Sequence, residues 1–124
     1  MDFTDNEREY LSTQRLARLA TIAPDGSPQN NPVGFHLNET LGTIDIYGHN
    51  LPASRKFRNV QQNPRVALVI DDLKSVDPWH VRGLEIRGRA EAVTANRPLI
   101  RIHPQTVFTW GLEPSQGMTK RTAA

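Results

Sequence analysis

Three cations within five residues form the sharpest candidate site in this sequence. They lie in the segment Ser54–Asn59, SRKFRN, at the predicted start of a short helix. Cations at a helix N-terminus oppose the helix dipole and cost stability unless an anion binds there. A phosphate would accept hydrogen bonds from free backbone N–H groups and from the basic side chains. The run also fits a solvated helix face whose arginine stems cover the core, and both interpretations stay open.

A second candidate is the proline-containing segment Gln29–Phe35, QNNPVGF. Proline cannot donate a ladder hydrogen bond, so this stretch is expected at a sheet edge or a bulge. Peptide groups freed in this way could bond a planar ligand, and Gly34 would allow its close approach. An ordinary edge strand explains the same pattern.

Aromatic and imidazole side chains add little on their own. Trp79 and Trp110 could stack on a planar ring system, but they fit core or interface packing equally well. The four histidines are scattered without the spacing of a metal site, which predicts no metal; they are His36, His49, His80 and His103. The motifs of a nucleophile elbow, a dinucleotide fold and a P-loop are all absent.

The elements that must position these residues are mostly short strands joined by turns. Thr4 and Glu7 have the spacing of a capping box, which predicts a helix over Asp5–Thr13. Ser54 caps a second helix that ends before Pro64. Alternation and turn residues predict strands over 16–23, 28–37, 43–49, 66–70, 80–94 and 99–110, a polar loop over 71–78 and a loose tail over 114–124. We expect 16–23 to be buried on both faces. The order favours a closed or partly closed antiparallel barrel.

Composition bounds the class of protein. The chain has 124 residues, which is the size of one domain spanning 1–124. It has no cysteine, and its net charge is only +2, so disulfides and thiolate sites are excluded and a nucleic-acid partner is not expected. The polar N-terminus is no signal peptide, and no apolar run approaches the length of a membrane helix. The sequence predicts a cytoplasmic protein without a membrane partner.

Four stretches together resemble a known family. In chain order they read RLARLATIAPDGSPQNNPV, SRKFRNVQQNPRVALVIDD, RGLEIRGRAEAV and IRIHPQTVFTWGL. They are similar to the pyridoxamine-phosphate-oxidase-like split barrels, and within them to the short deazaflavin-dependent oxidoreductases. The resemblance implies a mainly β fold, a six-stranded antiparallel split barrel with two or three short helices, which works as a homodimer with two cofactor sites at its interface.

The resemblance also implies roles for individual residues. Lys56 would bind the cofactor phosphate with help from Arg55 and Asn59, and Arg58 would stay solvated. Gln29, Asn31, Pro32 and Val33 would line the ring system, His49 would lie beside it, and Trp79 would approach the cofactor from the partner chain. The cofactor implied is the deazaflavin coenzyme F-420, with FMN as the alternative, and the activity is hydride transfer to a small organic substrate. No side chain stands out as an obligatory general acid.

Two non-enzymatic rivals stay open beside this activity. One is a barrel that stores or shields a flavin or a haem-like ligand without turnover. The weaker rival is a barrel that binds single-stranded nucleic acid through the basic helix. It is weaker because such sites interleave exposed aromatics with their charges, whereas only Phe57 lies within this cluster.

Overall fold

The computed structural model describes residues 2–112 and 117–123, within which it has two α-helices, one 3₁₀ turn and eight strands. In chain order the elements are α1 (Asp5–Ser12), β1 (Leu16–Ile22), β2 (Pro28–Gly34), β3 (His36–Asn38), β4 (Thr43–Ile46), η1 (Leu51–Ala53), α2 (Arg55–Gln62), β5 (Arg65–Ser75), β6 (His80–Val93), β7 (Leu99–Trp110) and β8 (Thr119–Thr122).

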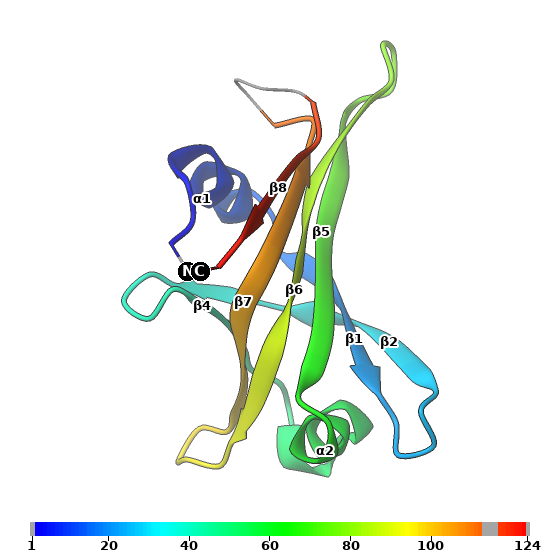
Figure 1. Cartoon of the computed structure of the whole chain (residues 1–124), viewed down its shortest axis with the longest axis vertical. Helices are drawn as coiled ribbons and strands as arrows, with labels where there is room; N and C mark the ends of the chain where they lie inside the picture. Colours follow the sequence, from blue (N-terminus) through cyan, green and yellow to red (C-terminus); the bar gives the residue numbers. More distant parts are fainter. Residues whose placement is uncertain (1, 113–116, 124) are drawn as a thin grey trace.

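The strands form one antiparallel sheet in the order β2-β1-β5-β6-β7-β4-β3, with β8 pairing β7 beside this path. β2 and β3 are consecutive in the chain, separated only by Phe35, yet they lie at the two ends of the strand order. The sheet must therefore curl back toward itself, and Figure 1 shows the resulting half-open barrel. This confirms the predicted mainly β split barrel.

The inner face of the curled sheet holds the core. Leu68, Ile86 and Ile102, from three neighbouring strands, are completely buried there. β1 follows the same alternation, since Leu19 is buried whereas Leu16 is 61% exposed. The expectation that β1 is buried on both faces was therefore wrong, because Leu16 and Arg18 on its outer face are exposed and Ala20 and Ile22 are only half-buried.

Two strands beyond the expected six arise at irregular points. The predicted strand over 28–37 breaks at Phe35 into β2 and β3. In the segment expected to be a loose tail, Thr119–Thr122 instead pairs with Thr106–Thr109 as β8. That prediction was wrong for β8, while residues 114–116 and 124 lie outside the described residues.

β5 extends through most of the segment predicted to be a polar loop. It reaches Ser75 by continuing to pair with β6, and its two carboxylates have partners within the sheet. Asp71 pairs with Arg18 on β1, and Asp72 pairs with Arg82 on β6. The long β5–β6 hairpin consequently projects beyond the barrel, as Figure 1 shows.

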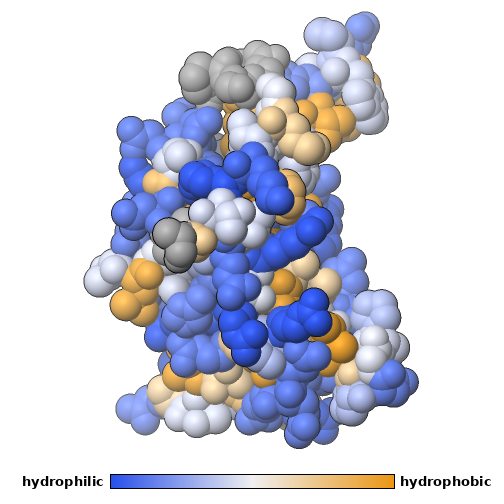
Figure 2. Space-filling view, viewed as in Figure 1, coloured by the Kyte–Doolittle hydropathy of each residue, from blue (hydrophilic) through white to orange (hydrophobic). Residues whose placement is uncertain are grey.

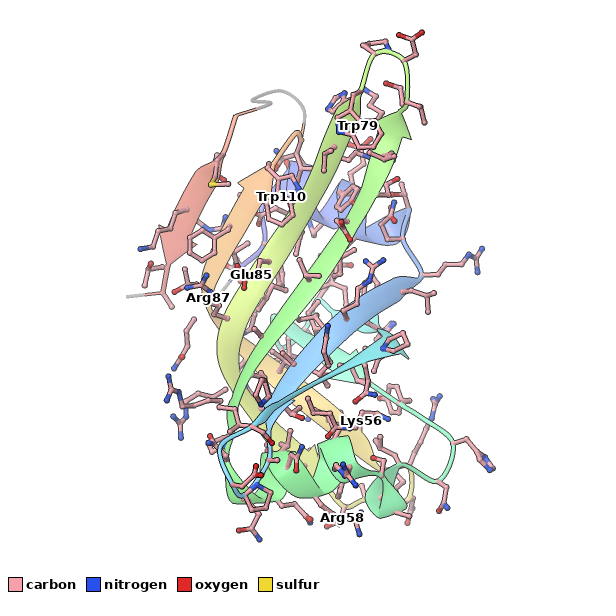
Figure 3. All side chains as sticks on the ribbon, turned by 90° about the vertical axis from the view of Figure 1, so that its right-hand side faces the viewer. Lys56, Arg58, Trp79, Glu85, Arg87 and Trp110 are labelled. Atoms are coloured by element: carbon pink, nitrogen blue, oxygen red, sulfur yellow. The ribbon has the colours of Figure 1, made fainter. Side chains whose placement is uncertain are left out.

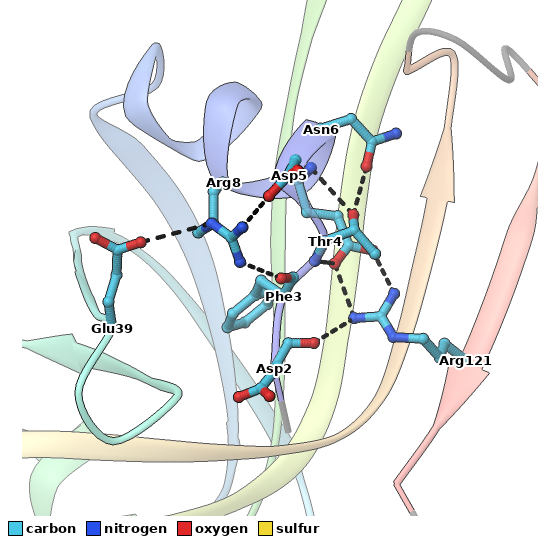
Figure 4. Close-up of polar contacts among 9 residues, drawn as sticks. Asp2, Phe3, Thr4, Asp5, Asn6, Arg8, Glu39 and Arg121 are labelled. Carbon is cyan, nitrogen blue, oxygen red and sulfur yellow. Dashed lines mark hydrogen bonds and ion pairs between the residues drawn. The ribbon is translucent and has the colours of Figure 1, made fainter.

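α1 begins as the capping box predicts. The Thr4 hydroxyl accepts from the Glu7 amide, and the Glu7 carboxylate accepts from the Thr4 amide. Glu7 is also buried and accepts two hydrogen bonds from the Arg121 guanidinium on β8, at 2.6 and 2.8 Å. This contact ties the first helix to the last strand, and Figure 4 shows Arg121 beside the residues that begin α1.

α2 closes one end of the barrel. The Ser54 hydroxyl accepts from the Phe57 amide at 3.3 Å, which confirms the predicted N-cap. Phe57 and Val60 are buried, and the helix packs against β1 and β6. No helix in the described part of the chain is long and apolar enough to cross a membrane.

Candidate functional site

The predicted basic run lies on the first turn of α2. Arg55 and Arg58 are exposed and Lys56 is half-buried. Within the described residues none of the three forms an ion pair or a side-chain hydrogen bond. Three uncompensated positive charges therefore gather at the end of the helix where the backbone dipole is also positive.

A hollow of about 810 Å³ lies between α2 and the turn that joins β1 to β2. Its lining residues are Ala23, Pro24, Asp25, Ser27, Arg55, Arg58, Asn59, Gln61 and Gln62. Lys56 is not among them, whereas Arg58, the residue expected to stay solvated, is. The structure thus offers an anion two sides of α2: the hollow beside Arg58 and the side that carries Lys56.

Asn59 connects the helix to the predicted ring-binding strand. Its side-chain amide nitrogen donates to the Thr21 hydroxyl at 3.0 Å and to the side-chain oxygen Oε1 of Gln29 at 2.8 Å. Asn59 and Thr21 are almost completely buried. Both amide hydrogens are therefore used inside the protein, and Asn59 positions α2 against β1 and β2.

Thr21 is a site residue that the sequence reasoning missed. A signal for it was present, because Thr21 follows Ala17 and Leu19 at two-residue spacing and so shares their buried face. A polar side chain on a buried face needs a hydrogen-bond partner, and Asn59 supplies it.

β2 carries the remaining residues predicted to line a ring system. It is an edge strand paired only with β1, as its prolines indicated. Pro32 is exposed and Asn31 is half-buried, while Val33 faces the core. The structure therefore brings Gln29 next to α2 and leaves the outer edge of β2 without a neighbouring strand in the described part of the chain.

His49 and Trp79 are placed differently from each other. β4 ends at Ile46, so His49 does not end that strand as expected; it is exposed in the turn before η1 and α2. Trp79 is 68% exposed near the tip of the β5–β6 hairpin. Figure 3 shows it at the opposite end of the molecule from Lys56 and Arg58, so one chain alone does not bring Trp79 to the basic run.

A polar network fixes the base of the hairpin that carries Trp79. The Tyr10 hydroxyl donates to Asp72 at 2.9 Å, and Arg82 donates to both Asp72 oxygens at 2.8 and 3.1 Å. The Arg82 hydrogen bonds hold the pKa of Asp72 below its ordinary value, and burial together with Asp72 raises the pKa of Tyr10. At neutral pH the carboxylate is charged and the phenol is protonated, so both anchor the hairpin.

The buried carboxylate of Asp45 is fully engaged as well. Arg101 donates to both of its oxygens at 3.1 Å, and Asn38 and Thr43 add hydrogen bonds at 3.0 and 2.9 Å. Burial raises the pKa of this group, but the hydrogen bonds outweigh it and leave the pKa lowered. Asp45 therefore joins β3, β4 and β7 and is not poised as a general acid. The described residues also include no cluster of three potential metal ligands.

Comparison with known proteins places this geometry in a family. Residues 3–111 match the sequence profile described as pyridoxamine 5'-phosphate oxidase. The chain belongs to the pyridoxamine 5'-phosphate oxidase family. It is 46% identical over 122 residues to the 5a,11a-dehydrotetracycline/5a,11a-dehydrooxytetracycline reductase of Streptomyces rimosus, covering 91% of this chain and 86% of that one.

Other relatives extend the comparison. A pyridoxine/pyridoxamine 5'-phosphate oxidase of Rhodopseudomonas palustris is 30% identical over 98% of this chain and 55% of its own length. A solved F420 reductase has a TM-score of 0.66 at 23% identity, covering 85% of this chain and 98% of that one. A heme binding protein from Mycobacterium smegmatis has a TM-score of 0.75 at 17% identity, covering 98% and 59%. At such identities these two structures show a shared fold and no more.

Proposed function

We propose that this protein binds the deazaflavin coenzyme F-420 and uses it to transfer a hydride to an organic substrate. The protein is an oxidoreductase, as its family and its reductase relative indicate. The finer proposal of F-420 rather than FMN draws on the resemblance to short deazaflavin-dependent oxidoreductases and on the F420 reductase of the same fold. FMN is the alternative cofactor.

The uncompensated cations at the capped start of α2 carry the proposal that the protein binds a cofactor with a phosphate. A cofactor phosphate there would accept hydrogen bonds from free backbone amides of the first turn and charge-assisted hydrogen bonds from Lys56 and Arg55. Both cofactors carry a phosphate, so the same contacts serve either one. Asn59 holds this turn against Gln29, which orients the phosphate site relative to β2.

The ring system would lie against the outer peptide edge of β2, near Asn31 and Pro32. The cofactor supplies the hydride chemistry, and the protein supplies binding, orientation and electrostatics. The name of the relative from Streptomyces rimosus indicates the substrate class that we propose: a dehydro compound of the tetracycline type, reduced at a carbon–carbon double bond.

A second copy of the chain completes the proposed site. Exposed apolar side chains gather on the projecting hairpin, namely Leu73, Val76, Trp79 and Val81, and Figure 2 shows apolar atoms near its base at the top of the view. In a two-fold dimer this hairpin can lie across the α2 end of the partner and bring Trp79 to the cofactor. Sedimentation at working concentration tests this, because a monomer would contradict the shared site.

The decisive experiment is a cofactor titration with Lys56→Ala. We expect this variant to lose about 1–3 kcal/mol of binding free energy for F-420 or FMN by calorimetry, the range for a charge-assisted contact. Arg15→Ala is the matched control, because Arg15 is exposed and has no partner among the described residues. Unchanged affinity in Lys56→Ala would overturn the phosphate assignment, and a loss confined to Arg58→Ala would move the phosphate to the hollow. A wild-type spectrum showing haem binding alone would overturn the cofactor class.

A further inference from the structure

Two aromatic side chains hold the base of the β5–β6 hairpin, one on each of its faces. Strand register sets Asp72 directly opposite Arg82. The neighbouring pair on the barrel side is Asp71 opposite Gly83. Successive residues of a strand point to opposite faces of a sheet, so these two pairs face opposite sides of the hairpin. An aromatic residue from outside the hairpin contacts each side.

Tyr10 of α1 holds the face that carries Asp72 and Arg82. Its side chain is only 4% exposed, so its hydroxyl needs a partner inside the protein. The hydroxyl donates to Asp72 at 2.9 Å and lies 3.3 Å from the Arg82 carbonyl oxygen. The Arg82 guanidinium lies 5.1 Å from the centre of the Tyr10 ring. One side chain therefore contacts both strands of the hairpin and fixes them relative to α1.

α1 is a firm support for the hairpin because it is tied to the barrel at other points. Glu7 accepts two hydrogen bonds from Arg121 of β8. Arg8 lies 3.6 Å from the carboxylate of Glu39 in the turn after β3. Through Tyr10 the hairpin is consequently fixed to the barrel and not only to a short helix.

Trp110 of β7 covers the opposite face of the hairpin base. A Cβ on Gly83 would lie only 2.9 Å from Cζ2 of the Trp110 indole, so the absence of a side chain at Gly83 makes room for this ring. Nearer the tip, the His80 ring contacts the Gly111 carbonyl oxygen at 3.0 Å. Figure 3 shows Trp79 farther from the barrel than Trp110. The contacts at the base thus set the direction in which the hairpin carries Trp79 away from the barrel.

We propose that Tyr10 is a positioning residue for the cofactor site of the partner subunit. The inference rests on the proposed function, in which Trp79 of one chain approaches the cofactor bound at α2 of the other. Tyr10 touches neither cofactor nor substrate and acts by aiming the hairpin. Three strand residues span about 10 Å, the separation of Arg82 from Trp79, so a small tilt at the base moves the indole off the cofactor ring.

A double-mutant cycle tests this role in calorimetric titrations with F-420 and with FMN. Tyr10→Phe keeps the buried ring and removes only the hydroxyl, whereas Trp79→Ala removes the indole that Tyr10 positions. We expect each single variant to bind the cofactor about two- to tenfold more weakly, the size of one aromatic stacking contact. The double variant should bind no more weakly than Trp79→Ala, since the hydroxyl acts only through the indole.

Glu7→Gln is the matched control on the same helix. It weakens the tie between α1 and Arg121 of β8 but leaves the Tyr10 hydroxyl in place. Its melting temperature should fall while its cofactor affinity stays that of wild type. A loss of affinity equal to that of Tyr10→Phe would overturn the proposal, because the effect would then be general to α1.

A mixed dimer tests whether Tyr10 acts across the interface. One chain carries Lys56→Ala and the other Tyr10→Phe, and different tags allow the mixed dimer to be purified. If each site combines α2 of one chain with the hairpin of the other, one site carries both changes and the other site carries neither. We expect half of the sites to bind with wild-type affinity. If no site does, Tyr10 serves the site of its own chain and the proposal is overturned.

The remaining outcomes distinguish this inference from the proposed function. If wild type binds neither cofactor, the proposed function fails and the inference fails with it. Wild-type affinity of Tyr10→Phe, or additive losses in the double variant, would overturn the positioning role and leave the proposed function standing. Unchanged affinity of Trp79→Ala would overturn both the shared site and the role of Tyr10, while the phosphate site at α2 would stand.

Discussion

The side chain of Asn59 is the point at which fold and proposed site depend on each other. It joins α2 to β1 through Thr21 and to β2 through Gln29, with hydrogen bonds of 3.0 and 2.8 Å. The change Asn59→Ala removes both N–H donors and leaves the Thr21 hydroxyl oxygen and the Gln29 side-chain oxygen without these hydrogen bonds. We expect it to weaken the fold and, through the loss of alignment between α2 and β2, cofactor binding as well.

The magnitude follows from the burial of the groups left behind. Thr21 is 1% exposed, so water cannot reach its hydroxyl, whereas Gln29 is half-buried and can turn toward solvent. A buried group left without its partner costs about 1–3 kcal/mol, and we expect about 2–3 kcal/mol for this pair of bonds. For a chain of this size each kcal/mol corresponds to roughly 3–5 °C, which predicts a melting temperature lower by about 6–15 °C.

Thermal and denaturant unfolding of the free protein measure this loss. Gln61→Ala is the matched control, since Gln61 is exposed on the same helix and its loss should stay within about 0.5 kcal/mol. If Asn59→Ala melts at the same temperature as Gln61→Ala, the bridge does not contribute to stability and the reasoning is refuted. A destabilised variant with wild-type cofactor affinity would separate the fold from the site.

Two further predictions concern stability. Burial raises the pKa of Glu7, but its hydrogen bonds, chiefly those from Arg121, outweigh burial and leave the pKa lowered. The charged Glu7 therefore stabilises the fold fully above the ordinary pKa of 4.5, and this stabilisation is lost as the pH falls below that value. The unfolding free energy of Glu7→Gln should vary less between pH 5 and 3 than that of wild type, and an equal pH dependence of the two would contradict this. A Cβ on Gly88 would overlap the His103 carbonyl oxygen, so Gly88→Ala should lower the unfolding free energy measured in urea by about 1–3 kcal/mol. Gly117→Ala is the control, because open space surrounds Gly117 and its unfolding free energy should not change. Equal urea midpoints for the two variants would refute the close approach at Gly88.

Local features of the fold could be predicted from the sequence because they depend on neighbouring residues. The Thr4 and Ser54 caps use side chains within three residues of the amides that they satisfy. The turn after β1 follows from Pro24 and Gly26 in the same way. The strand ends were less predictable, since β5 extends through Asp71 and Asp72 by pairing with β6, and their carboxylates find partners in Arg18 and Arg82 on other strands.

In the candidate site, too, the local features could be predicted from the sequence and the long-range contacts could not. The sequence alone determined that three cations begin one helix, since the composition of Arg55–Arg58 and the cap at Ser54 are local. Only the tertiary structure decided that Asn59 meets Thr21 and Gln29, and that Trp79 lies far from Lys56 within one chain. Only strand register places Asp72 opposite Arg82. Register joins residues far apart in sequence, and a shift of one residue would move every side chain to the other face.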